Sequence, residues 1–240
     1  MRSLASAALS LLDLTLTSAQ LAAFQAYADE LVEWNAKFNL TAITDPEGIQ
    51  IKHFLDSLAC RLAFRAASAS PAATVIDIGT GAGFPGIPLK IVCPAIRLTL
   101  VEATGKKVKF LEHIIARLGL SGVTAVKARA EEIGRDPAHR ERYDWAVARA
   151  VAEMPTLVEY LLPLVRLGGK CLAQKGEGAP AETQTAEKAL RILGGQLNQL
   201  IAVELPGVAE TRYLVVVDKV AATPAKYPRR AGTPGKAPLK

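Results

Sequence analysis

A glycine-rich turn beside an acidic residue is the segment of this sequence best suited to hold a small molecule. The apolar run 74–78 predicts a buried strand, and Gly79, Gly81 and Gly83 follow it at alternate positions. Glycines in such a strand-to-helix turn let the chain bend tightly and let its backbone approach a ligand. Asp77 precedes the first of these glycines. We therefore expect a ligand site whose chemistry tolerates a nearby carboxylate.

Two ligand classes fit this turn. The segment 81–86 matches the G-x-G-x-x-G pattern of dinucleotide-binding loops, which would indicate an NAD-type oxidoreductase. A pyrophosphate is anionic, however, and Asp77 would oppose it, while Pro85 and Pro88 remove amide donors that a phosphate needs. S-adenosylmethionine instead carries an ammonium and a sulfonium group, which Asp77 can help to hold. The residues favour S-adenosylmethionine, and the oxidoreductase is the alternative.

Further polar residues follow the next expected strands. Glu102 lies roughly 20 residues beyond the glycines, the distance typical of a carboxylate that binds ribose hydroxyls. Ala130 and Glu131 follow the third strand, where an adenine ring would lie. Arg149 follows the fourth strand and needs an anionic partner. That partner is the methionine carboxylate of the cofactor, a substrate phosphate, or a structural salt bridge.

The elements that must position these residues alternate between strands and helices. We expect strands at 74–78, 97–101, 123–127, 145–148 and 170–174, then two antiparallel strands within 197–205 and 213–217. This alternation predicts a doubly wound α/β fold with a mostly parallel, Rossmann-like sheet. Ligands bind such sheets at the carboxyl ends of the strands. The glycine turn and the polar residues after the later strands would therefore meet at one edge.

Helical patterns precede the first strand. Thr17 with Gln20 forms a capping-box pattern, and Asp45 before Pro46 predicts a second helix start. The stretch 66–73, rich in alanine and serine, is expected to be a linker. We divide the chain into an N-terminal helical extension (1–70), a methyltransferase domain (71–220) and a basic flexible tail (221–240).

Composition limits the remaining possibilities. The net charge is +6, and basic residues gather at Lys106, Lys107 and Lys109 and near the C-terminus at Lys219, Lys226, Arg229, Arg230, Lys236 and Lys240. Such clusters suit a polyanion, although a solvated helix face and tail explain them equally well. Three scattered cysteines and three distant histidines give neither a disulfide framework nor a metal site. We expect a soluble, cytoplasmic monomer without bound metal.

The motifs together resemble the bacterial small-subunit ribosomal RNA methyltransferase G family, also called glucose-inhibited division protein B. The resemblance runs from about residue 31 to residue 217. It rests on segments 39–43 (NLTAI), 53–58 (HFLDSL), 77–89 (DIGTGAGFPGIPL), 102–107 (EATGKK), 148–150 (ARA) and 174–176 (QKG). The glycine turn with its Pro-Gly-Ile-Pro extension is the most specific of these.

The resemblance implies methylation of N7 of a guanine in the decoding-region loop of 16S ribosomal RNA, with S-adenosylmethionine as the methyl donor. It implies cofactor contacts by Gly79, Phe84, Glu102, Ala103, Thr104, Ala130, Glu131 and Arg149. No catalytic base is expected, because guanine N7 already carries an in-plane lone pair. The substrate would be 16S rRNA or the small ribosomal subunit, without a membrane partner.

Substrate contacts follow in part from the family motifs. These motifs suggest Asn39, His53 and Lys175, and the basic cluster adds Lys106 and Lys107 for phosphate binding. For His53, a core or capping role explains the residue equally well. A third interpretation of the whole chain is a non-catalytic RNA-binding module on a methyltransferase fold.

Overall fold

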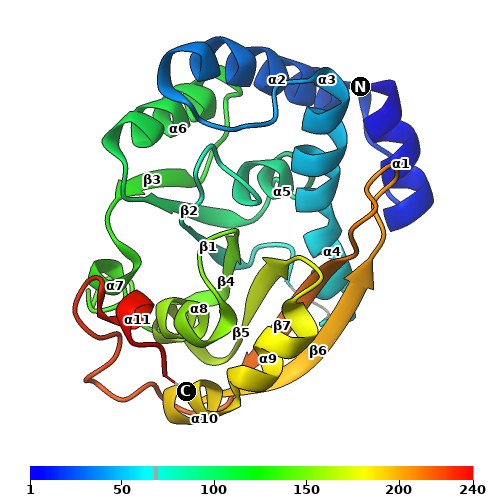
Figure 1. The fold of residues 1–240 in the computed structure, drawn as a ribbon. Helices are drawn as coiled ribbons and strands as arrows, with labels where there is room; N and C mark the ends of the chain where they lie inside the picture. The colour runs from blue at the N-terminus through cyan, green and yellow to red at the C-terminus, as the bar shows by residue number, and fades with distance from the viewer. Residues whose placement is uncertain (68–69, 240) are drawn as a thin grey trace.

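The computed structural model describes residues 1–67 and 70–239. Its described part contains a seven-stranded sheet with the order β3-β2-β1-β4-β5-β7-β6, in which β7 is antiparallel to both neighbours (Figure 1). The strands are β1 (Thr74–Ile78), β2 (Arg97–Glu102), β3 (Val123–Lys127), β4 (Tyr143–Arg149), β5 (Val165–Lys175), β6 (Gly195–Val203) and β7 (Arg212–Lys219). The doubly wound, mostly parallel fold and the antiparallel final pair are thus confirmed.

Helices cover both faces of the sheet. They are α1 (Arg2–Leu12), α2 (Ser18–Phe38), α3 (Pro46–Gly48), α4 (Asp56–Ala66), α5 (Gly86–Val92), α6 (Gly105–Arg117), α7 (Ala130–Ile133), α8 (Met154–Leu161), α9 (Ala179–Thr185), α10 (Glu187–Leu193) and α11 (Thr233–Lys236), with a 3₁₀ turn at Leu162–Leu164. Alternate residues of each strand point to opposite faces. Val75 and Val147 therefore pack with the N-terminal helices, whereas Ile76 and Ala146 pack with α8 and α10.

The N-terminal helices form one layer of this sandwich rather than a separate lobe. Residues of α1, α2 and α4 share an apolar cluster with α5, α6 and the sheet. The Thr17 hydroxyl accepts from the amide of Gln20 at 3.2 Å, and the Gln20 side chain accepts from the amide of Thr17 at 2.9 Å, which confirms the capping box. Two positions of the expected linker, 68 and 69, lie outside the described residues, and Ala66 still belongs to α4.

The helix expected to start at Asp45 is not regular. A π-helical segment, Ile49–Leu55, separates α3 from α4. Asp45 caps its start as expected, because its carboxylate accepts from the amide of Gly48 at 2.6 Å. π-Helical turns are rare and often occur at functional sites. Here the segment carries His53 and brings its backbone carbonyls to the end of β4. This irregularity was not predicted from the apolar pattern.

The C-terminal segment differs from expectation in two features: its packing against the domain and the ion-pair or hydrogen-bond partners of its cations. Residues 221–239 were expected to form an irregular, mobile tail, but they pack against α7 and α8 and include α11 (Figure 1). Lys219, counted with the basic tail, is 1% exposed and donates to the carbonyl of Leu162 at 2.8 Å. Arg229 forms an ion pair with buried Glu159. These two cations are therefore not free to bind a polyanion, and Lys240 lies outside the described residues.

Within residues 1–67 and 70–239, no helix combines the length and the apolar character needed to cross a membrane.

Candidate active site

The glycine turn joins β1 to α5 and is braced from below by Asp77. One carboxylate oxygen, Oδ2, accepts from the Thr80 hydroxyl at 2.6 Å and from the Gly86 amide at 2.8 Å. The three alternating glycines have φ values between 61° and 100°, which side chains rarely tolerate. A Cβ at Gly86 would lie 2.9 Å from Oδ2 of Asp77. The first role of Asp77 is therefore to hold the turn in shape.

The other oxygen of Asp77 is free. Oδ1 is buried and has no hydrogen-bond partner among the described residues. Burial raises the pKa of Asp77 to about 7, although the hydrogen bonds from Thr80 and Gly86 act in the opposite direction. A buried acceptor without a partner is costly unless a ligand supplies a donor. Oδ1 is thus an unused acceptor buried beneath the turn.

Asp77→Asn should remove a pH dependence of stability. The raised pKa means that the folded state binds a proton more tightly than the unfolded chain. This contribution to stability is present below about pH 4 and is lost as the pH rises to about 7. Urea unfolding across this range should show wild type losing stability relative to the variant. Asp29→Asn, at an exposed carboxyl, should keep the wild-type slope; the same slope in Asp77→Asn would contradict the prediction.

Glu102 closes the opposite side of the turn from the end of β2. Its Oε2 accepts from the Gly81 amide at 3.1 Å, and its Oε1 accepts from the Thr104 amide at 2.8 Å. The side chain is buried, yet each oxygen retains a second lone pair. A Cβ at Gly81 would meet no atom within 4 Å, so open space lies above this glycine. We call the open space beside Gly81 and the Glu102 carboxylate the cradle.

The remaining expected cofactor residues follow β2 and β3. Ala103 and Thr104 are exposed just before α6, and Ala130 begins α7. Glu131 is buried, and its Oε1 accepts from the amide of Gly232 in the C-terminal segment at 2.7 Å. Its carboxylate is therefore engaged by the tail.

Arg149, at the end of β4, joins the sheet to the N-terminal helices. Its Nη1 donates to Oδ2 of Asp56 at 2.8 Å and to the carbonyl of Lys52 at 3.2 Å. Its guanidinium lies 4.9 Å from the ring centroid of Phe84. Of the three partners considered for Arg149, the structure contains the salt bridge.

His53 and Phe84 stack face to face beside Arg149. Their ring centroids are 4.5 Å apart with an interplanar angle of 11°. His53 Nε2 lies 2.7 Å from the Thr41 hydroxyl, and its Nδ1 lies 3.3 Å from Nη2 of Arg149. Burial, followed by the charge of Arg149, lowers the pKa of His53 to about 3. The imidazole is therefore neutral near pH 7, and both of its nitrogens are occupied.

A cavity of about 410 Å³ opens at the ends of β4 and β5. Its walls include His53, Asp56, Arg149 and Lys175, together with Lys52, Gln174, Glu182 and Arg212. The expected substrate residue Lys175 pairs with Glu182 at 2.6 Å and donates to the carbonyl of Ala152 at 2.8 Å. Charged and polar side chains thus stand in the cavity wall, and two of them, His53 and Arg149, contact Phe84 of the glycine turn.

Several residues of this cavity were missed from sequence. Gln174 donates to the backbone carbonyl of Asp56 at 2.6 Å and so ties β5 to α4. Asp56 and Gln174 stand in the motifs HFLDSL and QKG, which were the available signal, but neither was assigned a role. Lys52 and Arg212 carried no motif signal. Only folding brings these four residues together.

The other expected substrate residues, Asn39, Lys106 and Lys107, do not line this cavity. Asn39 is exposed and ends α2 in a left-handed conformation. Lys106 is exposed in the first turn of α6, with its ammonium 5.8 Å from the Phe38 ring centroid. Lys107 is partly exposed on the same turn. In the part of the chain that the structure describes, no cluster of His, Cys, Asp and Glu side chains has the composition of a metal site.

Comparison with known proteins decides the family. The model of the GidB family, rRNA small subunit methyltransferase G, matches residues 20–209. The chain belongs to this family. Ribosomal RNA small subunit methyltransferase G of Roseiflexus castenholzii is 53% identical over 226 residues, which cover 94% of each chain. The protein of the same name from Alkaliphilus metalliredigens is 48% identical over 89% of this chain and 88% of its own. The resemblance in the motifs is confirmed.

Solved structures agree on the fold. TrmN from Thermus thermophilus superimposes with a TM-score of 0.53 at 19% identity, covering 71% of this chain and 53% of its own. A SAM-dependent methyltransferase from Aquifex aeolicus gives 0.53 at 15% identity, covering 72% and 93%. The [4+2]-cyclase SpnF gives 0.54 at 14% identity, covering 69% and 81%. Because a cyclase shares it, the fold alone does not define the reaction, and the family assignment rests on the sequence matches.

Proposed function

We propose that this member of the family transfers a methyl group from S-adenosylmethionine to N7 of a guanine in 16S ribosomal RNA. The observation that carries the proposal is the cradle between the glycine turn and β2. It combines the unpartnered Oδ1 of Asp77, open space above Gly81 and the carboxylate of Glu102. An oxidoreductase would need a pyrophosphate at this place, where two carboxylates oppose it.

The residues of the cradle fit the cofactor part by part. Asp77 would accept from its amino group, directly or through water, and Glu102 would accept from the ribose hydroxyls. Gly79, Gly81, Gly83 and Phe84 would line one side, and Ala103, Thr104, Ala130 and Glu131 would border the adenine. Arg149 supports the turn through Phe84. The cofactor itself supplies a methyl group activated by a sulfonium.

Positioning is the main contribution of the protein to this reaction. Guanine N7 needs no deprotonation, so no general base is required, and neutral His53 is held by two partners. Orienting two reactants in this way can supply about 7–11 kcal/mol of the barrier. The cavity beside the turn would hold the guanine, with Arg149 and Asp56 forming its rigid inner wall.

We infer that the partner is 16S rRNA or the small ribosomal subunit and that the protein acts as a cytoplasmic monomer. Lys52 borders the cavity and would offer positive charge to phosphates, and Arg212 would add to it although it also pairs with Glu210. Lys175 is already paired with Glu182, so it would contact the substrate as part of the polar wall rather than as a free cation. His53 would contact the base through its ring face rather than through its nitrogens. Asn39, Lys106 and Lys107 would extend the contact surface at the junction of α2 and α6.

The deciding experiment is a methyl-transfer assay with labelled S-adenosylmethionine and small subunits that lack the modification. Label recovered as 7-methylguanosine supports the proposal. Glu102→Ala should lower the transfer at subsaturating cofactor by at least about tenfold because the ribose contacts are lost. Glu112→Ala, at an exposed carboxylate on α6, is the control and should be fully active. Cofactor binding without transfer to any RNA would refute the substrate, and binding of NAD instead would favour the oxidoreductase.

A further inference from the structure

The C-terminal segment lies across the starts of α7 and α8 (Figure 1). α7 carries Ala130 and Glu131, which border the proposed adenine site. The amide of Gly232 donates to Oε1 of Glu131, in the first turn of α7, at 2.7 Å. The hydroxyl of Thr156, in the first turn of α8, donates to the carbonyl of Pro234 at 3.1 Å. One short stretch of the tail thus holds both helix starts.

The far end of α7 is held by the same segment. Arg135 donates to the carbonyl of Pro228 at 2.7 Å, and a Cβ at Gly134 would lie 2.9 Å from the Pro228 ring. α7 consists of a single turn, Ala130–Ile133, which is far too short to be stable by itself. Its position therefore depends on what packs against it, and the C-terminal segment contacts it at both ends.

The segment is anchored by a buried ion pair. Glu159 on α8 is fully buried, and its carboxylate accepts from Nε of Arg229 at 2.9 Å and from Nη2 at 2.6 Å. The backbone amide of Arg229 adds a bond of 2.8 Å. Removing one partner of such a pair leaves an uncompensated buried charge. Arg229 therefore fixes the stretch that reaches Gly232.

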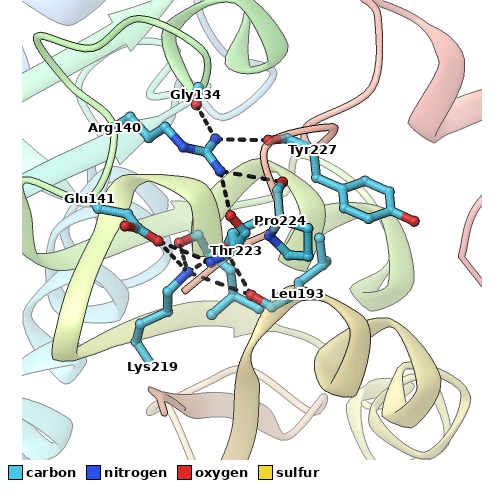
Figure 2. A network of polar contacts seen from close by, with 9 residues as sticks. Gly134, Arg140, Glu141, Leu193, Lys219, Thr223, Pro224 and Tyr227 are labelled. Atoms are coloured by element: carbon cyan, nitrogen blue, oxygen red, sulfur yellow. Dashed lines mark hydrogen bonds and ion pairs between the residues drawn. The ribbon is translucent and has the colours of Figure 1, made fainter. Parts of the chain in front are cut away.

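A second anchor fixes the beginning of the segment. Figure 2 shows Arg140 donating to the carbonyls of Thr223 and Tyr227, each at 2.7 Å. Buried Lys219 donates to the hydroxyl of Thr223 and lies 3.3 Å from Oε1 of Glu141. The path from β7 to α11 is thus determined by specific contacts along its length.

We propose that residues 226–239 are a structural part of the cofactor site, which position α7 and so set the wall against which the adenine ring packs. This inference rests on the proposed function. The family model ends at residue 209 and does not include this segment. Arg229 acts as a positioning residue, since it reaches the site only through the tail and α7.

The test measures the affinity of full-length variants for S-adenosylhomocysteine and for 5′-methylthioadenosine, which lacks the amino acid moiety. Arg229→Met should weaken both ligands about tenfold, equivalent to about 1.4 kcal/mol. KM for RNA and kcat at saturating cofactor should stay within about twofold, because neither step uses the adenine wall. Asp77→Asn, at the other end of the ligand, should weaken S-adenosylhomocysteine alone.

Matched variants separate this effect from loss of charge or of folding. Arg230→Met removes the same charge from the exposed neighbour and should bind like wild type. Arg229→Lys keeps the charge beside Glu159 but not the bidentate geometry, so its affinity should lie between those of wild type and Arg229→Met. Thr156→Val removes one hydrogen bond to the tail without leaving a buried charge and should weaken both ligands about threefold. If Arg229→Met does not unfold cooperatively, the affinities of Thr156→Val for the two ligands decide whether the tail positions α7.

A folded Arg229→Met protein with unchanged affinity for both ligands would overturn the inference. So would a change confined to KM for RNA, which would make the tail an RNA contact instead. If wild type binds neither ligand, the proposed function fails as well, and that failure is seen before any variant is made.

Discussion

Replacing Arg149 with methionine should lower the free energy of unfolding by about 3 kcal/mol. The side chains of Arg149 and Asp56 are only 14% and 9% exposed, so the variant leaves a carboxylate without its cation in a nearly dry environment. It also removes the donor to the carbonyl of Lys52 and the contact with the Phe84 ring. Denaturant unfolding measures this loss directly.

The same change should lower kcat/KM at least about a hundredfold, even where the variant is fully folded. Misplacement of reactive groups by 1 Å can cost about this factor, and Arg149 connects the glycine turn, through Phe84, to the cavity wall. Arg149→Lys should recover only part of the activity, because an ammonium cannot serve several planar partners at once.

Arg166→Met is the matched control. Arg166 also pairs with an aspartate, Asp144, at 2.7 Å, but its side chain is 53% exposed. It lies at the start of β5, whereas the cavity lies at the end of that strand. Such exposed pairs contribute less than about 1 kcal/mol. Equal losses of stability for Arg149→Met and Arg166→Met would contradict our description of the inner wall.

Alanine should destabilise the protein much less at Gly81 than at Gly83. At Gly81 the added methyl group meets no protein atom, so only the left-handed backbone is strained, at a cost of about 1 kcal/mol. At Gly83 it would lie 2.5 Å from Cδ1 of Ile87 and 2.7 Å from the hydroxyl of Tyr27, which raises the cost to about 3 kcal/mol. Gly83→Ala should therefore unfold at a clearly lower temperature than Gly81→Ala.

Affinity for S-adenosylhomocysteine should follow the reverse order. The methyl group in Gly81→Ala fills the cradle and should weaken binding more than tenfold, measured by titration calorimetry. Gly119→Ala is a close control, because Gly119 has φ +60° and open space but lies between α6 and β3. It should lose the same stability as Gly81→Ala and bind normally. Normal binding by Gly81→Ala would show that the cofactor does not use this space.

Much of the fold followed from local patterns. The strands 74–78 and 123–127 were bounded correctly, since apolar residues flanked by turn residues specify short parallel strands. The first is buried, whereas the second lies at the sheet edge and is only partly buried. β5 extends back to Val165, but its pairing with β4 shifts between Tyr143 and Trp145, so that continuous pairing starts at Lys170, the predicted first residue. The capping pairs at Thr17 and Asp45 were also evident, because caps act over three residues.

The contacts of the site were less accessible from sequence. Arg149 and Asp56 are 93 residues apart in the chain and meet where the π-helical segment ends and α4 begins. Nothing in the apolar spacing indicates that distortion. The C-terminal tail was misjudged for a similar reason. Its prolines and cations are typical of mobile segments. In the structure, buried Glu159, Glu131 and the contacts of Lys219 hold the tail from elements that are distant in the chain.

The place of β7 in the sheet bears on how the chain folds as it is synthesised. β6 is made before β7 but lies outside it, so β6 has no strand to pair with until residues 212–219 have left the ribosome. Until then β5 is an unprotected edge, the kind of surface on which incomplete chains associate. A premature stop before residue 212 should therefore give an aggregating product rather than a smaller working enzyme. Synthesis through β7 is thus required before the edge of β5 is covered.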